Sequence, residues 1–185
     1  LEDQLILHEG LRLEVYKCPA DKWTIGVGRN LEAQGLYPAE ELRILGTQGL
    51  SRGEVISRLK ERGISREEAM DMLEADIEIA ISDLFSFGWF ENLDHVRKKV
   101  VVDMRFNLGP AGFRGFRKMI AALEVGDYFK AAEEMQDSQW YHQVGNRSKR
   151  LVRMVATGEG YGARSSLTTL GSFFRSGTLS RKWVS

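Results

Sequence analysis

The sequence lacks the features of a disulfide-stabilised or membrane-spanning protein. It holds a single cysteine, Cys18, so no disulfide can form within the chain and its stability must come from packing. No apolar run approaches the roughly 20 residues that a membrane-spanning helix needs. No secretory signal peptide stands at the start. The chain opens at Leu1 rather than at a methionine, which fits a processed form or a piece of a longer protein.

The chain also has no excess of charge of either sign, because 26 Lys and Arg balance 26 Asp and Glu. The charges are unevenly placed, since residues 140–185 hold eight Lys or Arg against one acid, Glu159. A basic end of this kind can contact nucleic acid, a membrane surface or an anionic wall polymer, or it can be a solvated face. At 185 residues the chain can form one domain or two small lobes around a sizeable core.

The most informative stretch runs over residues 8–28. Glu9 ends a short apolar-periodic segment, a polar turn follows, and an alternating run closes the stretch. In a strand, Thr24, Gly26 and Gly28 would share one face, because successive side chains point to opposite sides. One hydroxyl and two glycines make a poor core, but they suit a floor that a bulky ligand approaches closely.

Glu9 is a candidate proton donor for cleavage of a glycosidic bond. Such a reaction needs an acid on one side of the sugar ring, and on the other a group that activates water or attacks the ring carbon. Apolar neighbours keep a carboxyl group protonated by desolvating it, and Leu5, Ile6 and Leu11 lie close in sequence. A surface glutamate at a helix end is the alternative that the local sequence leaves open.

This stretch resembles the active-site region of the phage-type lysozymes, the endolysins of glycoside hydrolase family twenty-four. Glu9, Cys18 and Thr24 keep the family spacing of Glu, eight residues, Asp or Cys, five residues and Thr. Further family motifs follow in the same order: Gly28-Arg29-Asn30-Leu31, the helix entry at 63–69, Phe106-Asn107-Leu108-Gly109, Gly115-Phe116, and Trp140-Tyr141, Gln143, Asn146-Arg147 and Lys149-Arg150. The resemblance covers about residues 1–160.

The resemblance implies a muramidase that hydrolyses the β-1,4 bond between N-acetylmuramic acid and N-acetylglucosamine in peptidoglycan. Glu9 would protonate the leaving oxygen, while Cys18 and Thr24 would hold or activate the water, so that the reaction inverts the anomeric configuration. It also implies that Asn146 and Arg147 join helices within the second lobe. No metal or cofactor is expected. Weaker candidates for binding substrate along the sugar cleft are Phe106, Asn107 and Gln143.

A cysteine at position 18 leaves the water-activating group open. A thiol with its ordinary pKa of about 8.5 is mostly neutral at pH 7 and is then a weaker base than a carboxylate. Asp21, three residues further on, is an alternative carboxylate. Cys18 can also be read as a small buried residue that fills space.

Two other functions are compatible with the sequence. A lytic transglycosylase would use Glu9 as acid and then as base, and the substrate's own hydroxyl would close a 1,6-anhydro product without a second carboxylate. A non-catalytic peptidoglycan-binding module of a virion protein would bind sacculi and release no reducing sugar.

The patterns and the resemblance predict an α+β, mostly α, two-lobed lysozyme-like fold. Residues 1–64 are expected to form an N-terminal lobe with a cleft hairpin, 65–84 a connecting helix and 85–162 an all-helical lobe, which together make the catalytic domain. The basic tail 163–185 matches no motif. We expect it to dock on the protein, to be partly disordered, or to contact a membrane or wall surface.

Local signals place the individual elements. A hairpin is expected at 11–29 and a loop at 109–112. Asp76 lies on the apolar stripe of the connecting helix, where a carboxylate is costly unless it is paired, and Arg29 is its expected partner. Helices are expected at 1–8, 38–45, 51–62, 65–84, from Asn92 as the cap to 108, 113–125, 128–139 and 146–157, with capping boxes at Ser51–Glu54 and Ser65–Glu68.

The resemblance also indicates where the protein acts. We expect a monomer, or a part of a larger virion protein, that acts on peptidoglycan and not on nucleic acid. A phage enzyme without a signal is made in the host cytoplasm and reaches the periplasm through a holin, or it travels on the virion. The segment 31–63 is longer than expected in the family and is either a flap near the cleft or a structural filler. The sequence does not indicate the host or the preferred wall chemistry.

Overall fold

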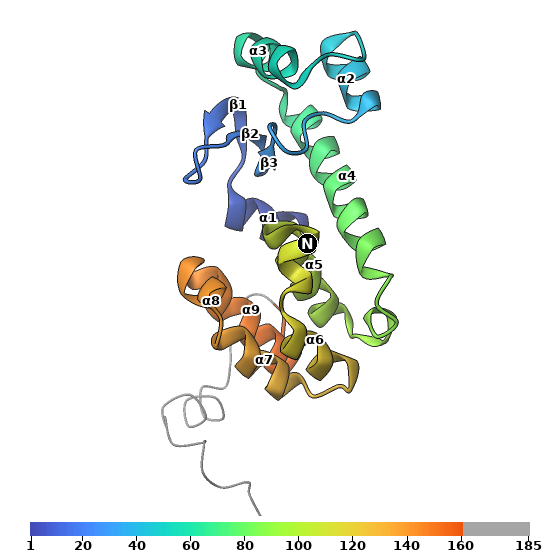
Figure 1. Ribbon diagram of the computed structural model, residues 1–185, viewed down its shortest axis with the longest axis vertical. Coiled ribbons are helices and arrows are strands. Elements are labelled where there is room, and N and C mark those ends of the chain that lie inside the picture. Colours follow the sequence, from blue (N-terminus) through green and yellow to red (C-terminus); the bar gives the residue numbers. More distant parts are fainter. Residues whose placement is uncertain (161–185) are drawn as a thin grey trace, which may run out of the picture.

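The computed structural model describes residues 1–160, so the expectations for the tail 163–185 lie outside the described residues. Two lobes are joined by the long helix α4 (Arg66–Leu84), and the short helix α1 (Glu2–Glu9) lies between them (Figure 1). The predicted α+β, mostly helical, lysozyme-like fold is confirmed. The division into the ranges 1–64, 65–84 and 85–162 stays a prediction.

The N-terminal lobe contains a three-stranded antiparallel sheet in the order β1-β2-β3. Strands β1 and β2 form the expected hairpin, in which Tyr16 lies opposite Thr24. The two-residue strand β3 was not expected, because so short a segment carries no periodic signal. The bounds are β1 (Arg12–Lys17), β2 (Trp23–Gly26) and β3 (Arg29–Asn30).

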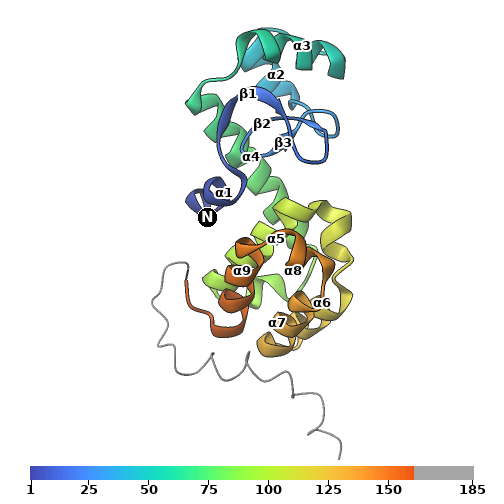
Figure 2. The same ribbon diagram turned by 90° about the vertical axis from the view of Figure 1, so that its left-hand side faces the viewer.

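The long segment after β3 folds into the two predicted helices, α2 (Pro38–Leu45) and α3 (Arg52–Arg62). Pro38 occupies the first turn of α2, where its missing N–H costs nothing. Ser51 accepts a hydrogen bond from the backbone N–H of Glu54, so the predicted capping box is confirmed. Both helices lie at the end of the lobe that is distant from α5 (Figure 2).

The predicted pairing of Arg29 with Asp76 is confirmed and is part of a larger buried cluster. The Arg29 Nε donates to Asp76 Oδ2 at 2.6 Å, and its Nη1 and Nη2 donate to the two carboxylate oxygens of Glu40 at 2.8 and 3.1 Å. Burial raises the pKa of Asp76 above its ordinary value, against the opposing charge and hydrogen bond of Arg29. The cluster therefore fastens α2 to the sheet and to the connecting helix α4.

The C-terminal lobe is all helical, with two differences from the expected boundaries. Asp94, not Asn92, caps the central helix, because its side chain accepts hydrogen bonds from the N–H groups of Val96 and Arg97. The expected loop at 109–112 is helical around a kink at Gly109, whose φ is 70°. The bounds are the 3₁₀ turn Phe90–Asn92, α5 (His95–Arg114), α6 (Arg117–Glu124), α7 (Tyr128–Gln136), α8 (Gln139–Gln143) and α9 (Asn146–Thr157).

The reason for the second difference is the position of Pro110. Proline fits the first turn of a helix, and the left-handed glycine before it ends one helical segment so that Pro110 can start the next. The helix expected at 113–125 begins later, at Arg117, and the helix expected at 128–139 ends earlier, at Gln136. The break at Gly115–Phe116 and the new cap at Ser138 separate α6 and α8 from their neighbours.

Each lobe has its own core, and a third apolar cluster joins them. The third cluster unites Leu5 of α1 with Val27, next to the sheet, and with Leu73 and Ile77 of α4. Phe106 of α5 packs against this cluster. Helix α1 is thus held from both lobes, which fixes the residue at its end. Within residues 1–160, the structure shows no helix with the length and apolarity that crossing a membrane requires.

Candidate active site

Glu9 is the last residue of α1 and lies where α1, α5 and α9 meet. Its Oε1 accepts a hydrogen bond from Arg147 Nη1 of α9 at 2.5 Å and one from Asn107 Nδ2 of α5 at 3.4 Å. The side chain is 20% exposed. Glu9 is therefore held by donors far away in sequence and is not a solvated helix end.

Of the floor predicted from Thr24, Gly26 and Gly28, only Gly28 lies against this carboxyl group. The prediction is wrong for Gly26, which ends β2 and faces Ile64 and Ala69 in the N-terminal lobe. A Cβ added at Gly28 would stand 3.2 Å from Oε2 of Glu9, and the φ of Gly28 is 77°, a conformation that other residues rarely adopt. The two oxygens of Glu9 thus have different surroundings. Oε1 faces the two donors, while Oε2 lies over bare backbone.

Asn107 connects the carboxyl group to the core of the second lobe. Its Nδ2 donates to Glu9, and its Oδ1 accepts a hydrogen bond from Nε1 of the buried Trp140 at 3.0 Å. The indole N–H can only donate, so it fixes which end of the amide points at Glu9. Trp140 lies in the core and affects Glu9 through its hydrogen bond to Asn107.

Cys18 and Thr24 both lie at the turn end of the hairpin, where the Cys18 N–H donates to the Lys22 carbonyl at 3.0 Å and Thr24 lies opposite Tyr16. The pKa of the Cys18 thiol lies below its ordinary value, because a backbone hydrogen bond from Lys22 favours the thiolate. Burial opposes this shift, and hydrogen bonds with the Ala20 backbone and the Thr24 side chain reinforce it. Thr24 is buried, and its Oγ1 donates to the carbonyl of Lys22 at 2.9 Å. The hairpin therefore favours a negative charge on Cys18.

Asp21 lies on the outer side of the same turn. It is the single non-glycine residue with a positive φ (57°) among residues 1–160, and its side chain is 88% exposed. Its Oδ1 lies 3.5 Å from Nζ of Lys17, which also donates to the Asp21 carbonyl at 2.7 Å. The carboxylate is directed to solvent and not toward Cys18.

Tyr16 and Arg147 belong to this site although the sequence did not assign them to it. Burial raises the pKa of Tyr16; Arg12, stacked on its ring, opposes the shift, and the charges of Glu9 and Cys18 add to it. Tyr16 therefore lies within electrostatic reach of both groups. Arg147 was expected to join helices of its own lobe, and its place in the family signature was the available signal for a role in the site.

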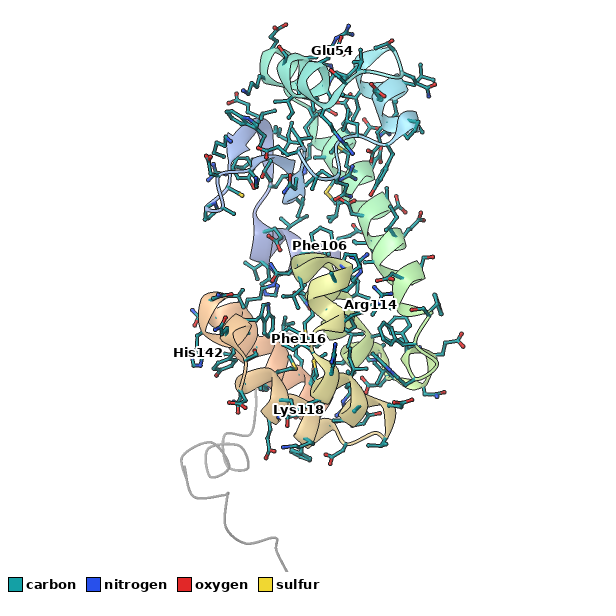
Figure 3. All side chains as sticks on the ribbon, viewed as in Figure 1. Glu54, Phe106, Arg114, Phe116, Lys118 and His142 are labelled. Carbon is teal, nitrogen blue, oxygen red and sulfur yellow. The ribbon has the colours of Figure 1, made fainter. Side chains whose placement is uncertain are left out.

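The remaining candidates, Phe106 and Gln143, line two separate pockets. Phe106 borders a pocket of about 340 Å³ together with Gly28 and residues of the segment after β3. Gln143 borders a pocket of about 650 Å³ together with Trp140 and Phe116. Figure 3 shows Phe106 at the height where the two lobes meet and Phe116 deeper in the C-terminal lobe. Asn107 lines neither of these pockets, and its side chain hydrogen-bonds to Glu9 and Trp140.

The described part of the chain shows no group of three or more His, Cys, Asp or Glu side chains that could hold a metal ion. Two titratable groups of the site are relevant to acid–base chemistry. These are one carboxyl group held at one oxygen, and one thiol whose ionised form is stabilised. A carboxyl group and a thiolate are side chains that can act as an acid and a base.

Comparison with known proteins agrees with this geometry. The family model described as phage lysozyme matches residues 7–156. The "Probable T4-type lysozyme 1" and "Probable T4-type lysozyme 2" of Dictyostelium discoideum are 28% and 30% identical over 162 residues, covering 85% of this chain and 94% of each relative. The "Pre-baseplate central spike protein Gp5" of Enterobacteria phage T4 is 28% identical over 169 residues, covering 88% of this chain and 29% of that protein. The chain belongs to the phage lysozyme family and is a peptidoglycan-degrading glycoside hydrolase.

Proposed function

We propose that this lysozyme cleaves the β-1,4 bond between N-acetylmuramic acid and N-acetylglucosamine with inversion, with Glu9 as the general acid. The observation that carries the proposal is the asymmetric setting of the Glu9 carboxyl group. Arg147 and Asn107 both donate to Oε1, while Oε2 lies over Gly28. A proton on Oε2 is thereby presented on the side where the backbone leaves room for a sugar.

The reaction follows from this arrangement. The proton passes from Oε2 of Glu9 to the glycosidic oxygen, and the bond from that oxygen to the anomeric carbon breaks. A water molecule attacks the anomeric carbon from the opposite face and gives its proton to the Cys18 thiolate. The carboxylate left on Glu9 is stabilised by the charge-assisted hydrogen bond from Arg147. Inversion results because one displacement takes place.

We assign the water-holding role to Cys18 and Thr24 and not to Asp21. The lowered pKa of Cys18 increases the fraction of thiolate near neutral pH, and the Thr24 hydroxyl donates to the Lys22 carbonyl in the same turn. Asp21 is directed into solvent beside Lys17. A carboxylate that points into solvent is not held in the fixed orientation that is needed to keep one water molecule in place.

The glycan is proposed to lie between the two lobes and to contact Phe106, Asn107 and Gln143. The support for this is that Phe106 borders the pocket that includes Gly28, Gln143 borders the pocket that includes Trp140, and Asn107 hydrogen-bonds to both Glu9 and Trp140. Aromatic and amide side chains are typical of sites that bind sugar polymers, because they offer apolar area with a few hydrogen bonds. In this arrangement Asn107 contacts both the acid and the substrate.

The site of action is proposed to be the bacterial wall, reached from the periplasm or from the virion. The match to the central spike protein supports a virion-borne enzyme, because the matched region is a part, 29%, of a protein named as a component of the phage particle. The two T4-type lysozymes, which the chain matches over 94% of their length, support a free enzyme. Mass spectrometry of purified particles separates these two settings, because a virion-borne enzyme is found in the particle.

The function is tested by digesting purified sacculi with the wild type and with Glu9→Gln and reading the products by mass spectrometry. Glu9→Gln is expected to lower turnover by about a hundredfold or more, because the side chain can no longer supply a proton. Glu14→Gln, an exposed glutamate of β1, is the matched control and should retain wild-type turnover. Reducing-end products in the inverted anomeric form are expected.

Other products would reject the proposal. Muropeptides with 1,6-anhydro ends would identify a transglycosylase. Binding to sacculi without any released product would identify a binding module. Full turnover by Glu9→Gln would remove Glu9 from the acid role.

A further inference from the structure

A fully buried aspartate, Asp103, lies behind Glu9 on the central helix α5. Its exposed fraction is 0%, and its neighbours Val102 and Met104 belong to the core of the C-terminal lobe. A carboxylate in such surroundings is costly unless several donors compensate for the lost water. No sequence pattern indicated a role for Asp103, because the helix is apolar on most sides.

Three side chains from two other helices surround the Asp103 carboxylate. Gln4 Nε2 of α1 donates to Oδ2 at 2.6 Å, and Nδ1 of His8, also in α1, lies 2.9 Å from the same oxygen. Arg147 Nε of α9 donates to Oδ1 at 2.8 Å. The helix that carries Glu9 is therefore attached to α5 and α9 through this one carboxylate.

Arg147 is divided between Asp103 and Glu9. Its Nε donates to the Asp103 side chain and its Nη2 to the Asp103 carbonyl at 3.4 Å, while Nη1 donates to Glu9. The guanidinium group is planar, so two contacts on one side fix the direction of the third N–H. Asp103 thus determines where the Arg147 donor meets Glu9.

Asp103 also balances the charge of Arg147. Without Asp103, Glu9 would be the single ion-pair partner of the buried Arg147 guanidinium group among its described contacts. With Asp103 in place, the buried guanidinium group has a second counter-charge and is held from two sides.

We propose that Asp103 is a positioning residue of the glycosidase reaction: by holding and neutralising Arg147, it sets the orientation of the Glu9 carboxyl group. The inference rests on the proposed role of Glu9 and deepens it. The role is separate from stabilising the fold, because it acts on the rate of bond cleavage through Arg147. It predicts that the consequence of losing the Asp103 charge depends on Arg147.

The first test is Asp103→Asn, which keeps the shape of the side chain and removes its charge. With soluble, uncross-linked glycan strands as substrate, kcat is expected to fall about tenfold or more, as small misplacements of reacting groups do. KM should stay within about twofold, since substrate binding is not altered. The matched control is Asp83→Asn, because Asp83 is likewise an aspartate that holds arginine side chains, Arg105 and Arg114, but at the α4–α5 contact.

Asp83→Asn is expected to leave kcat unchanged at a temperature where both variants are folded. If Asp103→Asn retains wild-type kcat, or if kcat and KM change alike in both variants, the positioning role is overturned. Glu9→Gln is measured alongside. Its inactivity together with a fully active Asp103→Asn rejects this inference and leaves the proposed function standing.

A double-mutant cycle separates positioning from a general structural role. In the Arg147→Gln background, Asp103→Asn should change kcat by less than about twofold, because the group through which it acts is gone. Additive losses would overturn the proposal. Arg147→Lys serves if Asp103→Asn does not fold. It keeps the charge but lacks the rigid planar fork, so contacts with Asp103 no longer fix the direction of the donor to Glu9. A lower kcat is expected, and full kcat in this variant would also overturn the proposal.

Discussion

Gly28 links the shape of the backbone to the environment of the Glu9 carboxyl group. Its φ of 77° is open to glycine at little cost, and a Cβ at this position would approach Glu9 Oε2 to 3.2 Å. Gly28→Ala should therefore have two effects, one on stability and one on activity. The free energy of unfolding should fall by about 1 kcal/mol or more from the left-handed conformation alone.

The activity of Gly28→Ala should fall by about tenfold or more, because the new methyl group displaces the oxygen that carries the proton. Gly46→Ala is the matched control, since Gly46 has a φ of 72° and no atom within 4 Å of the added Cβ. Denaturant unfolding and turnover on sacculi check the pair. Equal turnover in the two variants would show that Gly28 affects only the backbone.

Cys18 gives the site a pH dependence that a carboxylate would not give. If the thiolate accepts the proton from water, activity falls as the pH drops through the pKa of Cys18, which lies below the ordinary thiol value. Cys18→Asp should extend activity to lower pH, because an aspartate ionises near pH 3.9. Cys18→Ala should lose about a hundredfold in kcat.

A rescue experiment distinguishes a lost base from a damaged hairpin. Azide needs no base to attack the anomeric carbon, so it should restore product formation in Cys18→Ala and not in Glu9→Gln. The kcat/KM profile between about pH 4 and about pH 9 checks the first expectation. Wild-type activity in Cys18→Ala would transfer the role to another group, with Asp21 as the next candidate.

The catalytic residues predicted from the sequence lie in one local segment. Glu9, Cys18 and Thr24 follow one another within a helix and a hairpin, and their resemblance to the family motif identified them. Arg147 is 138 residues from Glu9, and Asp103 is 95 residues from His8. Such contacts depend on how α5 and α9 pack against α1. No local periodicity reports this packing, so both residues remained outside the predicted site.

Some helix boundaries follow from local sequence signals, and others depend on tertiary packing. Helices α2, α3, α4 and α9 follow the predictions because proline, capping boxes and an apolar stripe mark their ends. The boundaries within 92–139 differ because glycine and proline were read as a loop. In the folded chain Pro110 starts a helical segment. Its position relative to the kink at Gly109 depends on the packing of α5.

The segment after β3 is attached to the rest of the lobe through two neighbouring glutamates that are equally buried, each 7% exposed. Glu40 pairs with the guanidinium group of Arg29, while Glu41 accepts the backbone N–H groups of Gly49 and Leu50. One glutamate therefore joins α2 to the sheet, and the other closes the loop beside α2. Their equal burial makes them a matched pair.

Glu40→Gln should lower the free energy of unfolding by about 3 kcal/mol, because the buried Arg29 loses one of its two counter-charges. Glu41→Gln should cost about 1 kcal/mol, the usual scale of a neutral hydrogen bond. Urea unfolding followed by circular dichroism measures both. Similar losses in the two variants would show that the charge of Glu40 is not what holds α2 in place.

In the whole molecule, the described body and the tail differ in charge. Residues 161–185 contain four basic side chains and no acidic one, so residues 1–160 contain 22 basic and 26 acidic side chains. The family match ends at residue 156, and every residue assigned to the site precedes it. Peptidoglycan carries carboxylates, so the net charge of the body repels the wall whereas the tail attracts it.

A chain that ends at Gly160 should keep the kcat of the full chain on soluble glycan strands, because its site is complete. On intact sacculi it should be slower at low ionic strength, where the Debye length is about 30 Å at 0.01 M, and the gap should close near 1 M salt, where that length is about 3 Å. A full-length variant with Arg164, Arg175, Arg181 and Lys182 all changed to Gln is the matched control and should behave like the truncated chain. Equal rates at every salt concentration would show that the tail does not guide the enzyme to the wall. A gap that persists at high salt would assign the attraction to the apolar side chains of the tail, because screening acts on charges alone.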